Sequence, residues 1–420
     1  MPDRFRPAGP LHAPGLAVLR SPDEVLFGCG MAAAAGRVAG RYGRRVLVCT
    51  DPAIAATKGF RAVARALEAA RLEVAVFDRG AVDVPMEVID EAVERGRAFR
   101  PDAIVAVGGG SSIDLAKVCA LLLAHAGPLS RYYGEHRVPG PVLPLIALPT
   151  TAGTGSEVTP VSVVGDPELG MKVGVSSPHL IPRAAICDPL LTLEAPARVT
   201  AYAGIDALSH AIEAFMAVER RPAWDLPLDR VAVGKNALSD ALALVAISAI
   251  GPALEAAVRD GSDLEARSQM LYGSLAAGLA FANAGVSAAH ALQFAVGAAT
   301  GTPHGLGTGM MLPYVMAFNR PERAGALVEI AAALGDPDAD AVDAVHRIGL
   351  AIGLPASLAD LGVEPDRLPA LAEQAAGIDR LVRNNPRELD AAGCEAILEA
   401  AWHGDPARVL SPPTARAPAP

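Results

Sequence analysis

The chain has 420 residues, more than one hydrophobic core usually serves, so we expect two domains. Its net charge of −10 argues against nucleic acid or an anionic membrane surface as a partner, because both attract basic patches. Its five cysteines include no CxxC pair, which is typical of a reducing compartment. We therefore expect a globular, cytoplasmic protein without disulfides.

No segment has the pattern of a targeting signal or a membrane span. Residues 1–16 carry four prolines and no apolar stretch of signal-peptide length. The longest apolar run, residues 241–258, contains Gly251-Pro252 and Glu255 and falls short of the ~20 apolar residues that a span needs. The proline-rich tail, residues 409–420, is predicted to be disordered because it has almost nothing to bury.

The first 190 residues alternate short β-branched runs with helical runs. This alternation predicts βαβ units around a mostly parallel sheet. Two further runs, residues 158–164 and 171–175, are expected to form a β-hairpin appended to it. The predicted strands are 24–27, 45–49, 72–77, 103–107 and 145–148, and the predicted helices are 60–70, 86–99 and 112–124.

From Pro196 onward the strand signal disappears and only helical periodicity remains. We therefore predict an α/β domain over residues 1–192, an all-helical domain over 193–408, and the disordered tail after it. The helices expected in the second domain are 201–218, 237–257, 263–282, 288–299, 324–334, 339–352 and 394–402.

Two glycine-rich turns could hold the phosphates of a nucleotide. Gly108-Gly109-Gly110-Ser111-Ser112 follows a strand and opens a helix, so backbone N–H groups and the helix N-terminus can approach a phosphate. Ser111 or Ser112 can cap that helix and also contact the phosphate. The run from Gly28 to Ala33 also follows a strand and fits G-x-G-x-x-A, with Asp51 placed as a ribose-binding acid. The pattern alone leaves both turns open.

A third loop, residues 148–160, combines five hydroxyl side chains with two glycines directly after a strand. An ordinary polar loop would explain the hydroxyls. Their density beside glycines favours a ligand cleft instead.

The helical domain contains a candidate metal site. Asp206 and His210 are four residues apart in a helical run, so both side chains lie on one face. His290 and His304 could complete a set of one carboxylate and three imidazoles for a first-row divalent metal. Taken singly, each could instead be a helix cap, a surface residue or a core histidine.

Four motifs occur in order: 108–114, 149–159, 204–210 and 302–305. Together they resemble the iron-containing (group III) alcohol dehydrogenases, over residues 20–400. The resemblance implies a dehydroquinate synthase-like fold, with an α/β N-terminal nucleotide-binding domain followed by an all-α metal-binding domain.

The resemblance also implies roles for individual residues. It places the pyrophosphate at Gly109, Gly110 and Ser111, and a cofactor groove along Thr150 and Thr151. It implies that Lys172 reaches the nicotinamide ribose and that Asp51 binds the adenosine ribose of NAD. The turn at Gly28–Gly30 then becomes structural. The implied metal ligands are Asp206, His210, His290 and His304.

The implied reaction is hydride transfer between nicotinamide and an alcohol or its aldehyde or ketone. The metal would be Fe²⁺, with Zn²⁺ as an alternative because it binds such a site more tightly. It would act as a Lewis acid on the substrate oxygen. We expect the partner to be a small molecule and the protein to form a homodimer or larger homo-oligomer.

Two positions depart from the family pattern. Phe294 stands where many members carry a second histidine, often assigned to a proton relay, and Val84 stands where asparagine is common before the proline.

Three other functions stay open: a maleylacetate reductase-like enzyme, a dehydroquinate synthase-type lyase, and a non-catalytic binding protein. The lyase would need several cationic groups near the metal motifs, for which Lys235 and Arg220-Arg221 are the candidates.

Overall fold

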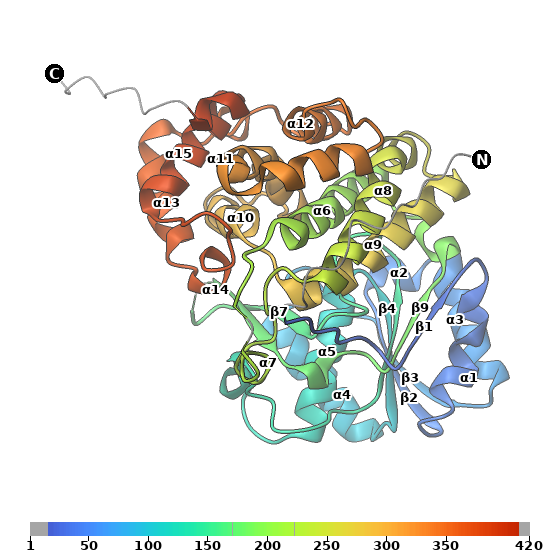
Figure 1. Ribbon diagram of the computed structural model, residues 1–420. Helices are drawn as coiled ribbons and strands as arrows, with labels where there is room; N and C mark the ends of the chain where they lie inside the picture. The colour runs from blue at the N-terminus through green and yellow to red at the C-terminus, as the bar shows by residue number, and fades with distance from the viewer. Residues whose placement is uncertain (1–15, 170, 222, 411–420) are drawn as a thin grey trace.

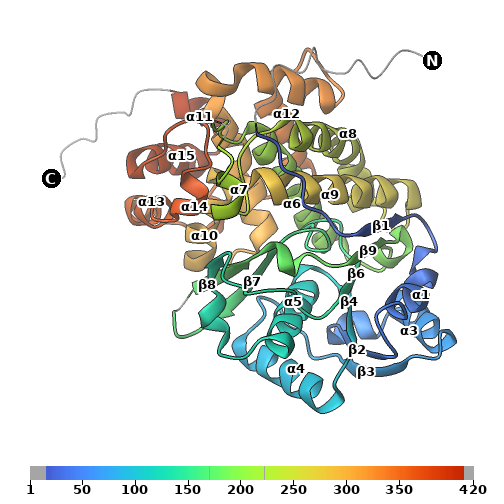
Figure 2. The same cartoon turned by 60° about the horizontal axis from the view of Figure 1, so that its bottom comes forward.

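The computed structural model of the protein describes residues 16–169, 171–221 and 223–410. An α/β half holds the N-terminal residues, and a helical half holds everything from α6 onward (Figure 1). The two halves meet at the C-terminal ends of the parallel strands (Figure 2). The predicted order, a parallel α/β part followed by a helical part, is confirmed.

The sheet of the α/β half has six parallel strands in the order β1-β9-β6-β4-β2-β3. The sequence missed only β9 among them, a short apolar run between proline-containing turns. The strands are β1 (Glu24–Phe27), β2 (Arg45–Cys49), β3 (Glu73–Phe77), β4 (Ala103–Gly108), β6 (Leu145–Pro149) and β9 (Ala184–Cys187).

Helices cover both faces of this sheet, as the alternation of strands and helices predicts. On one face α4 (Met86–Phe99) and α5 (Gly110–Ala124) pack over Leu47 and its neighbours, and on the other α1 (Ala35–Ala39) and α3 (Lys58–Ala69) pack over Val46 and Val48 (Figure 2). Successive residues of a strand face opposite sides, so a strand between two helical layers must be apolar throughout.

A small second sheet borders the junction of the halves. It has the order β5 (Gly134–Glu135), β8 (Met171–Ser176), β7 (Val161–Asp166), with β7 and β8 antiparallel. The predicted hairpin is therefore confirmed. It begins at Val161 rather than at residue 158, because residues 158–160 belong to the preceding loop.

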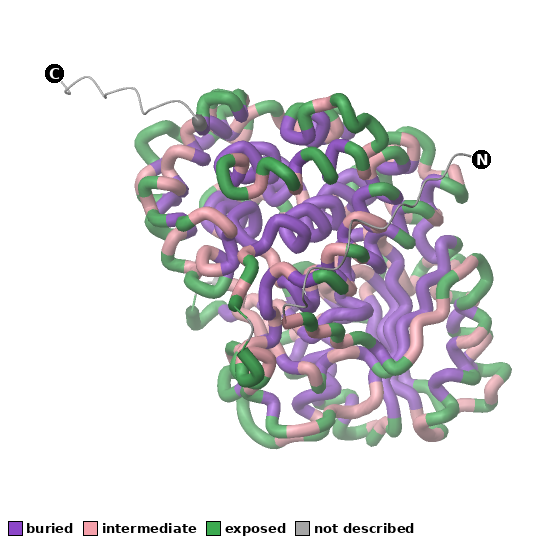
Figure 3. The backbone as a smooth tube through the Cα atoms, viewed as in Figure 1, coloured by how far each residue is buried: buried purple, intermediate pink, exposed green. Residues whose placement is uncertain are grey.

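The helical half is built around α6 (Ala197–Met216), which packs against α8 (Ala237–Arg259), α9 (Leu264–Ala284) and α11 (His304–Ala333). Every residue of α6 from Gly204 to Met216 is buried, and this helix runs through the purple centre of Figure 3. The other helices are α10 (Ala288–Thr300), α12 (Ala341–Ala351), α13 (Leu368–Ala376), α15 (Ala391–His403) and the short α2 (Pro52–Ala55), α7 (Leu226–Asp229) and α14 (Asp379–Val382).

One helix of the described residues, α8, is long and apolar enough to cross a membrane. It continues through Pro252 and packs against α6 and α9 along one face, with 39% of its apolar window buried. The predictions for residues 1–15 and for the tail from 411 onward lie outside the described residues. The predicted start of the tail, at residue 409, is wrong by at least two residues, because Val409 and Leu410 end the 3-10 helix Pro406–Leu410.

The division at residue 192/193 lies between the end of β9 and the start of α6 and stays a prediction. The segment before β1 also contacts the helical half. Arg20 hydrogen-bonds Asn283, Val231 and Pro227, all in the helical half.

Candidate metal centre and nucleotide cleft

Three of the four predicted metal ligands converge on one point. Asp206 Oδ1 lies 3.8 Å from His290 Nε2 and 3.8 Å from His304 Nε2. One ligand atom from each of these residues lies within 4.8 Å of the others. His210 stands beside this trio, with its Nε2 3.9 Å from Asp206 Oδ2 and its ring stacked on that of His290.

Local structure explains why residues so far apart in sequence meet. The chain bends by 100° between α9 and α10, which places His290 in the first turn of α10 opposite α6. His304 is the first residue of α11. The next residue is Gly305, where a Cβ would lie 2.1 Å from the carbonyl oxygen of Tyr202. Only glycine therefore lets α11 begin this close to Asp206.

Glu213 is a site residue that our sequence analysis did not identify. Its Oε2 lies 2.5 Å from His290 Nδ1, and its Oε1 accepts hydrogen bonds from Ser287 Oγ and the backbone N–H of Ala289. A carboxylate on Nδ1 fixes the ring so that Nε2 faces Asp206. The sequence did carry a signal, because residues 206, 210 and 213 share one face of α6 at helical spacing.

Gln293 does the same for His304. Its Oε1 accepts a hydrogen bond from His304 Nδ1 at 2.9 Å, which leaves Nε2 free to face Asp206. The Phe294 ring lies 5.7 Å from the His304 ring, between centroids. Each convergent histidine thus has its second nitrogen occupied, as is usual for metal-bound imidazole.

The electrostatics of this cluster favour a cation. Burial, with the nearby Glu213 carboxylate, raises the pKa of Asp206 to about 7. Burial also holds the pKa of His210 and of His304 well below the ordinary value, so both rings are neutral. The buried atoms Asp206 Oδ1 and His290 Nε2 find no hydrogen-bond partner among the described residues.

The donor set fits a divalent metal. Ligand atoms about 2.0–2.2 Å from a common ion lie roughly 3–4 Å apart, which matches the distances from Asp206 Oδ1 to His290 and His304. A buried carboxylate and imidazole with unused ligand atoms would be costly without such an ion.

The predicted cofactor residues lie where parallel sheets bind nucleotides. The order of strands changes direction between β2 and β4, and ligands bind outside the strand ends at such a point. Asp51 follows β2, Gly109 follows β4, and Ser112 Oγ donates to Asp51 Oδ2 at 3.2 Å. Asp51 Oδ1 caps α2 by accepting from Ala53 and Ile54.

The competing turn at Gly28–Gly30 is structural. It follows β1, a strand at the edge of the sheet. Its backbone N–H groups at Gly30 and Ala32 donate to the carboxylate of Asp188, so a side chain already uses the donors that a phosphate would need.

The hydroxyl-rich loop packs directly on the glycine-rich turn. A Cβ at Gly110 would lie 2.6 Å from Thr154, and one at Gly109 would lie 3.2 Å from Thr151. Thr150 Oγ1 is buried and has no hydrogen-bond partner among the described residues. Buried Lys117 ties the end of the loop to α5 by donating to Thr159 O and Val161 O.

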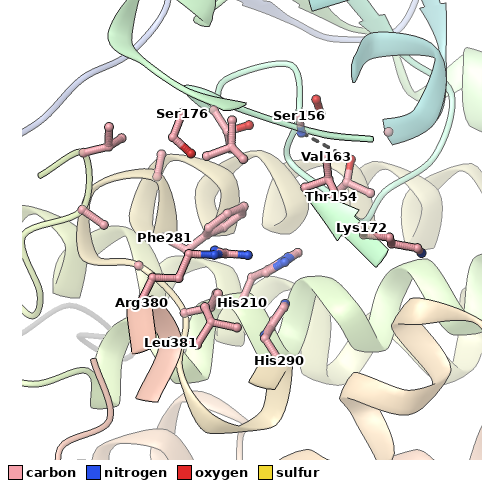
Figure 4. A pocket seen from close by; sticks show the side chains of 18 of the residues that line it. Thr154, Ser156, Val163, Lys172, Ser176, His210, Phe281, His290, Arg380 and Leu381 are labelled. Atoms are coloured by element: carbon pink, nitrogen blue, oxygen red, sulfur yellow. Dashed lines mark hydrogen bonds between the residues drawn. The ribbon is translucent and has the colours of Figure 1, made fainter. Parts of the chain in front are cut away.

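One cavity of about 290 Å³ connects these regions. Its wall runs from Gly110 and Ser111 past Lys172 to Asp206, His290 and His304, and Figure 4 shows the labelled side chains around it. Lys172 forms an ion pair of 2.6 Å with Asp83, and both residues line the cavity. The other predicted cofactor residues do not line it, namely Asp51, Gly109, Ser112, Thr150 and Thr151.

A parallel sheet and a helical bundle joined by one such cavity form a dehydroquinate synthase-like fold. The family model described as iron-containing alcohol dehydrogenase matches residues 22–189, and the C-terminal model of the Fe-containing alcohol dehydrogenase family matches residues 229–402. The chain belongs to the iron-containing alcohol dehydrogenase family.

Individual relatives agree. The chain is 32% identical to a sulfoacetaldehyde reductase of Bilophila wadsworthia, covering 90% of this chain and 97% of the relative. It is 34% identical to an NAD-dependent methanol dehydrogenase of Bacillus methanolicus, covering 82% and 88%. A crystal structure of 1,3-propanediol oxidoreductase superposes with a TM-score of 0.86 at 31% identity, covering 92% of this chain and all of that one.

These similarities confirm the predicted family, the fold and the reaction class. The protein is an oxidoreductase that acts on CH–OH groups, interconverting alcohols and carbonyl compounds. The maleylacetate reductase-like enzyme, the lyase and the non-catalytic binding protein are not favoured.

Proposed function

We propose that the protein is a metal-dependent, NAD-linked dehydrogenase that interconverts a small alcohol and its aldehyde or ketone. One observation carries the proposal: a single cavity joins the Asp206–His290–His304 cluster to the glycine-rich N-terminus of α5. Hydride transfer requires nicotinamide and the reacting carbon to be adjacent, and this cavity is a site where both fit.

Asp206, His290 and His304 would hold the metal, with His210 as the fourth ligand. A divalent ion there supplies Lewis-acid polarisation of the substrate oxygen, and nicotinamide supplies or accepts the hydride. Glu213 and Gln293 keep the two imidazole rings oriented. Iron is the expected ion in this family, and zinc the alternative by the order of affinities.

Different residues of the cleft would contact different parts of the cofactor. Gly109, Gly110 and Ser111 would present backbone N–H groups to the pyrophosphate, and Thr150 and Thr151 would border the groove. Lys172 would reach the nicotinamide ribose, for which it must leave or share Asp83. Ser112 would act by donating to Asp51, the proposed partner of the adenosine ribose.

Phe294 bears on proton transfer. Its ring borders His304 and the cavity, and phenylalanine cannot carry a proton. A relay would therefore use water or a ribose hydroxyl. We further propose a cytoplasmic homo-oligomer without a nucleic-acid or membrane partner, in keeping with the net charge of −10.

A turnover assay tests the proposal. Purified protein is stripped with a chelator, reloaded with Fe²⁺ or Zn²⁺, and assayed with NAD or NADH against a panel of short alcohols and aldehydes. We expect turnover only after reloading. Full activity of the metal-free protein, or no turnover with any pair in the panel, would contradict the proposal.

A further inference from the structure

Three arginines also line the cavity. Arg220 comes from the segment after α6, and Arg380 and Arg383 come from α14 and the residue after it. The sequence pointed to Arg220 as a cation near the metal motifs and gave no sign of the other two. Lys235, the other candidate, instead donates to the Phe215 carbonyl and pairs with Asp240.

Most charged groups facing the cavity are already paired. Arg383 bridges Glu135 and Asp379, and Lys172 pairs with Asp83. Asp114 accepts hydrogen bonds from Ser156 and Val163 and lies near Lys117. The exceptions matter because an uncompensated charge in a cavity attracts an opposite charge.

Arg380 is the main exception. Within the described part of the chain, its guanidinium makes no hydrogen bond or ion pair, and its Cζ lies 5.9 Å from the centroid of the Phe294 ring. The side chain is open to the cavity, yet protein atoms surround it closely enough that desolvation lowers its pKa. Its planar set of donors is therefore available to a ligand.

Arg220 adds to the positive field. One of its terminal nitrogens donates to the Arg383 carbonyl, and its buried Nε has no partner among the described residues. It has no carboxylate partner among the ion pairs of the described chain. Arg220 and Arg380 thus face the cavity without an ion pair among the described residues. Glu135 acts on Arg380 electrostatically, but its carboxylate is already bound by Arg383 and by the Val231 N–H.

The backbone that carries Arg380 is held in place. Asn384 donates to the carbonyls of Ala284 and Val286 at the turn between α9 and α10. Asn385 and Asn319 exchange hydrogen bonds between their side chains. Figure 4 shows the Arg380 side chain extending into the pocket, its nitrogens directed to the side where His210 and His290 lie.

Phe294 sets the geometry between the arginine and the metal cluster. Its ring lies near both the Arg380 guanidinium and the His304 ring. A substrate whose oxygen is bound at the cluster would therefore extend past Phe294 toward Arg380, which lines the same cavity.

We propose that Arg380 selects substrates with an anionic end, a carboxylate or a sulfonate, and anchors that end while the reacting oxygen lies at Asp206, His290 and His304. This rests on the proposed dehydrogenase function and narrows its substrate class to short hydroxy acids, hydroxysulfonates and the matching aldehydes. Guanidinium binds a planar carboxylate, or two oxygens of a tetrahedral sulfonate, with paired, charge-assisted hydrogen bonds.

The test compares aldehydes of equal chain length that end in methyl, carboxylate or sulfonate, assayed with NADH and metal-loaded protein. For wild type we expect kcat/KM to be about 10- to 100-fold higher for the anionic aldehydes. Arg380→Gln should remove most of this advantage by raising KM for the anionic aldehydes. Its kcat/KM for the methyl-ended aldehyde should stay within about threefold of wild type, and its KM for NADH should not change. Arg380→Lys should retain part of it.

Arg259→Gln is the matched control, because it removes the same charge from an exposed side chain of the helical half. It should leave all three substrates unchanged. A wild-type preference for the methyl-ended aldehyde, or equal losses on all three substrates in Arg380→Gln, would overturn the inference and leave the proposed function standing. No turnover with any of the three in wild type would contradict the proposed function itself.

Discussion

Two histidines of the candidate metal centre are oriented by partners on their outer nitrogen. Glu213 holds His290, and Gln293 holds His304, so that both Nε2 atoms point to Asp206. Residues of this kind touch neither metal nor substrate, yet they set the ring position and the basicity of the ligand.

We predict that Glu213→Gln lowers metal affinity about 10- to 100-fold, because the amide is a weaker acceptor for the His290 N–H. Competition with a chromogenic chelator measures this directly. Glu265→Gln, an exposed position on α9, controls for the lost charge and should not alter affinity. Unchanged affinity in Glu213→Gln would show that Glu213 does not orient the ligand.

Asp51 should govern the choice of cofactor. Like charges ~4 Å apart repel by about 4 kcal/mol at an effective dielectric of 20, which disfavours the 2′-phosphate of NADP. Solvent and side-chain movement relieve much of this, so we expect NAD to be preferred about 10- to 100-fold, or roughly 1.4–2.7 kcal/mol.

The test variant is Asp51→Asn. Asp51 Oδ1 also caps α2, and asparagine can keep that cap while losing the charge. Comparing kcat/KM for both cofactors, we expect the variant to use NADP relatively better and NAD less well. Equal use of both cofactors by wild type would contradict the role of Asp51.

At the scale of elements, the end of α4 offers a simple test of backbone strain. Arg100 follows this helix with φ of 55°, a left-handed conformation that disfavours side chains with a Cβ. Its side chain is exposed, so little packing is lost on removing it. Arg100→Gly should raise the free energy of unfolding by about 0.5–1 kcal/mol.

Thermal denaturation of wild type, Arg100→Gly and Arg100→Ala measures this effect. The alanine variant keeps the Cβ and should be no more stable than wild type. The comparison therefore separates backbone strain from loss of the arginine charge. Equal melting temperatures for the glycine and alanine variants would show that strain at this position is negligible.

The elements that the sequence predicts correctly are those with a clear hydrophobic period. Strand β2 and helix α4 have the bounds that their patterns indicate. The first half of α11 went unpredicted because Gly305, Gly307, Gly309 and Pro313 have low helix propensity. Burial against α6 and α10 stabilises it instead, and a single sequence does not show that burial.

The site residues likewise fall into those that local spacing predicts and those that only the tertiary structure brings together. Asp206 and His210 are one turn apart, so local spacing suffices to pair them. His290 and His304 come to Asp206 only through the bend between α9 and α10 and the close packing at Gly305. The bond from Glu213 to His290 and the position of Arg380 join residues far apart in the chain, and no local pattern marks such contacts.

At the scale of the whole molecule, the cavity lies where the two halves meet. Contacts across the junction include Arg20 with Val231, Glu135 with Arg383, and Glu135 with Val231. Because the proposed nucleotide cleft and the proposed metal cluster come from different halves, neither half alone would hold a complete site.

The central claim is that this cluster binds a metal on which turnover depends. Metal-stripped protein is titrated with Fe²⁺, and bound metal and NADH turnover are measured in the same samples, for wild type and for His304→Ala. We predict about one ion per chain, turnover in proportion to bound metal, and a His304→Ala protein that is folded but neither retains metal nor turns over. Turnover by metal-free wild type, or full metal retention by His304→Ala, would contradict the account.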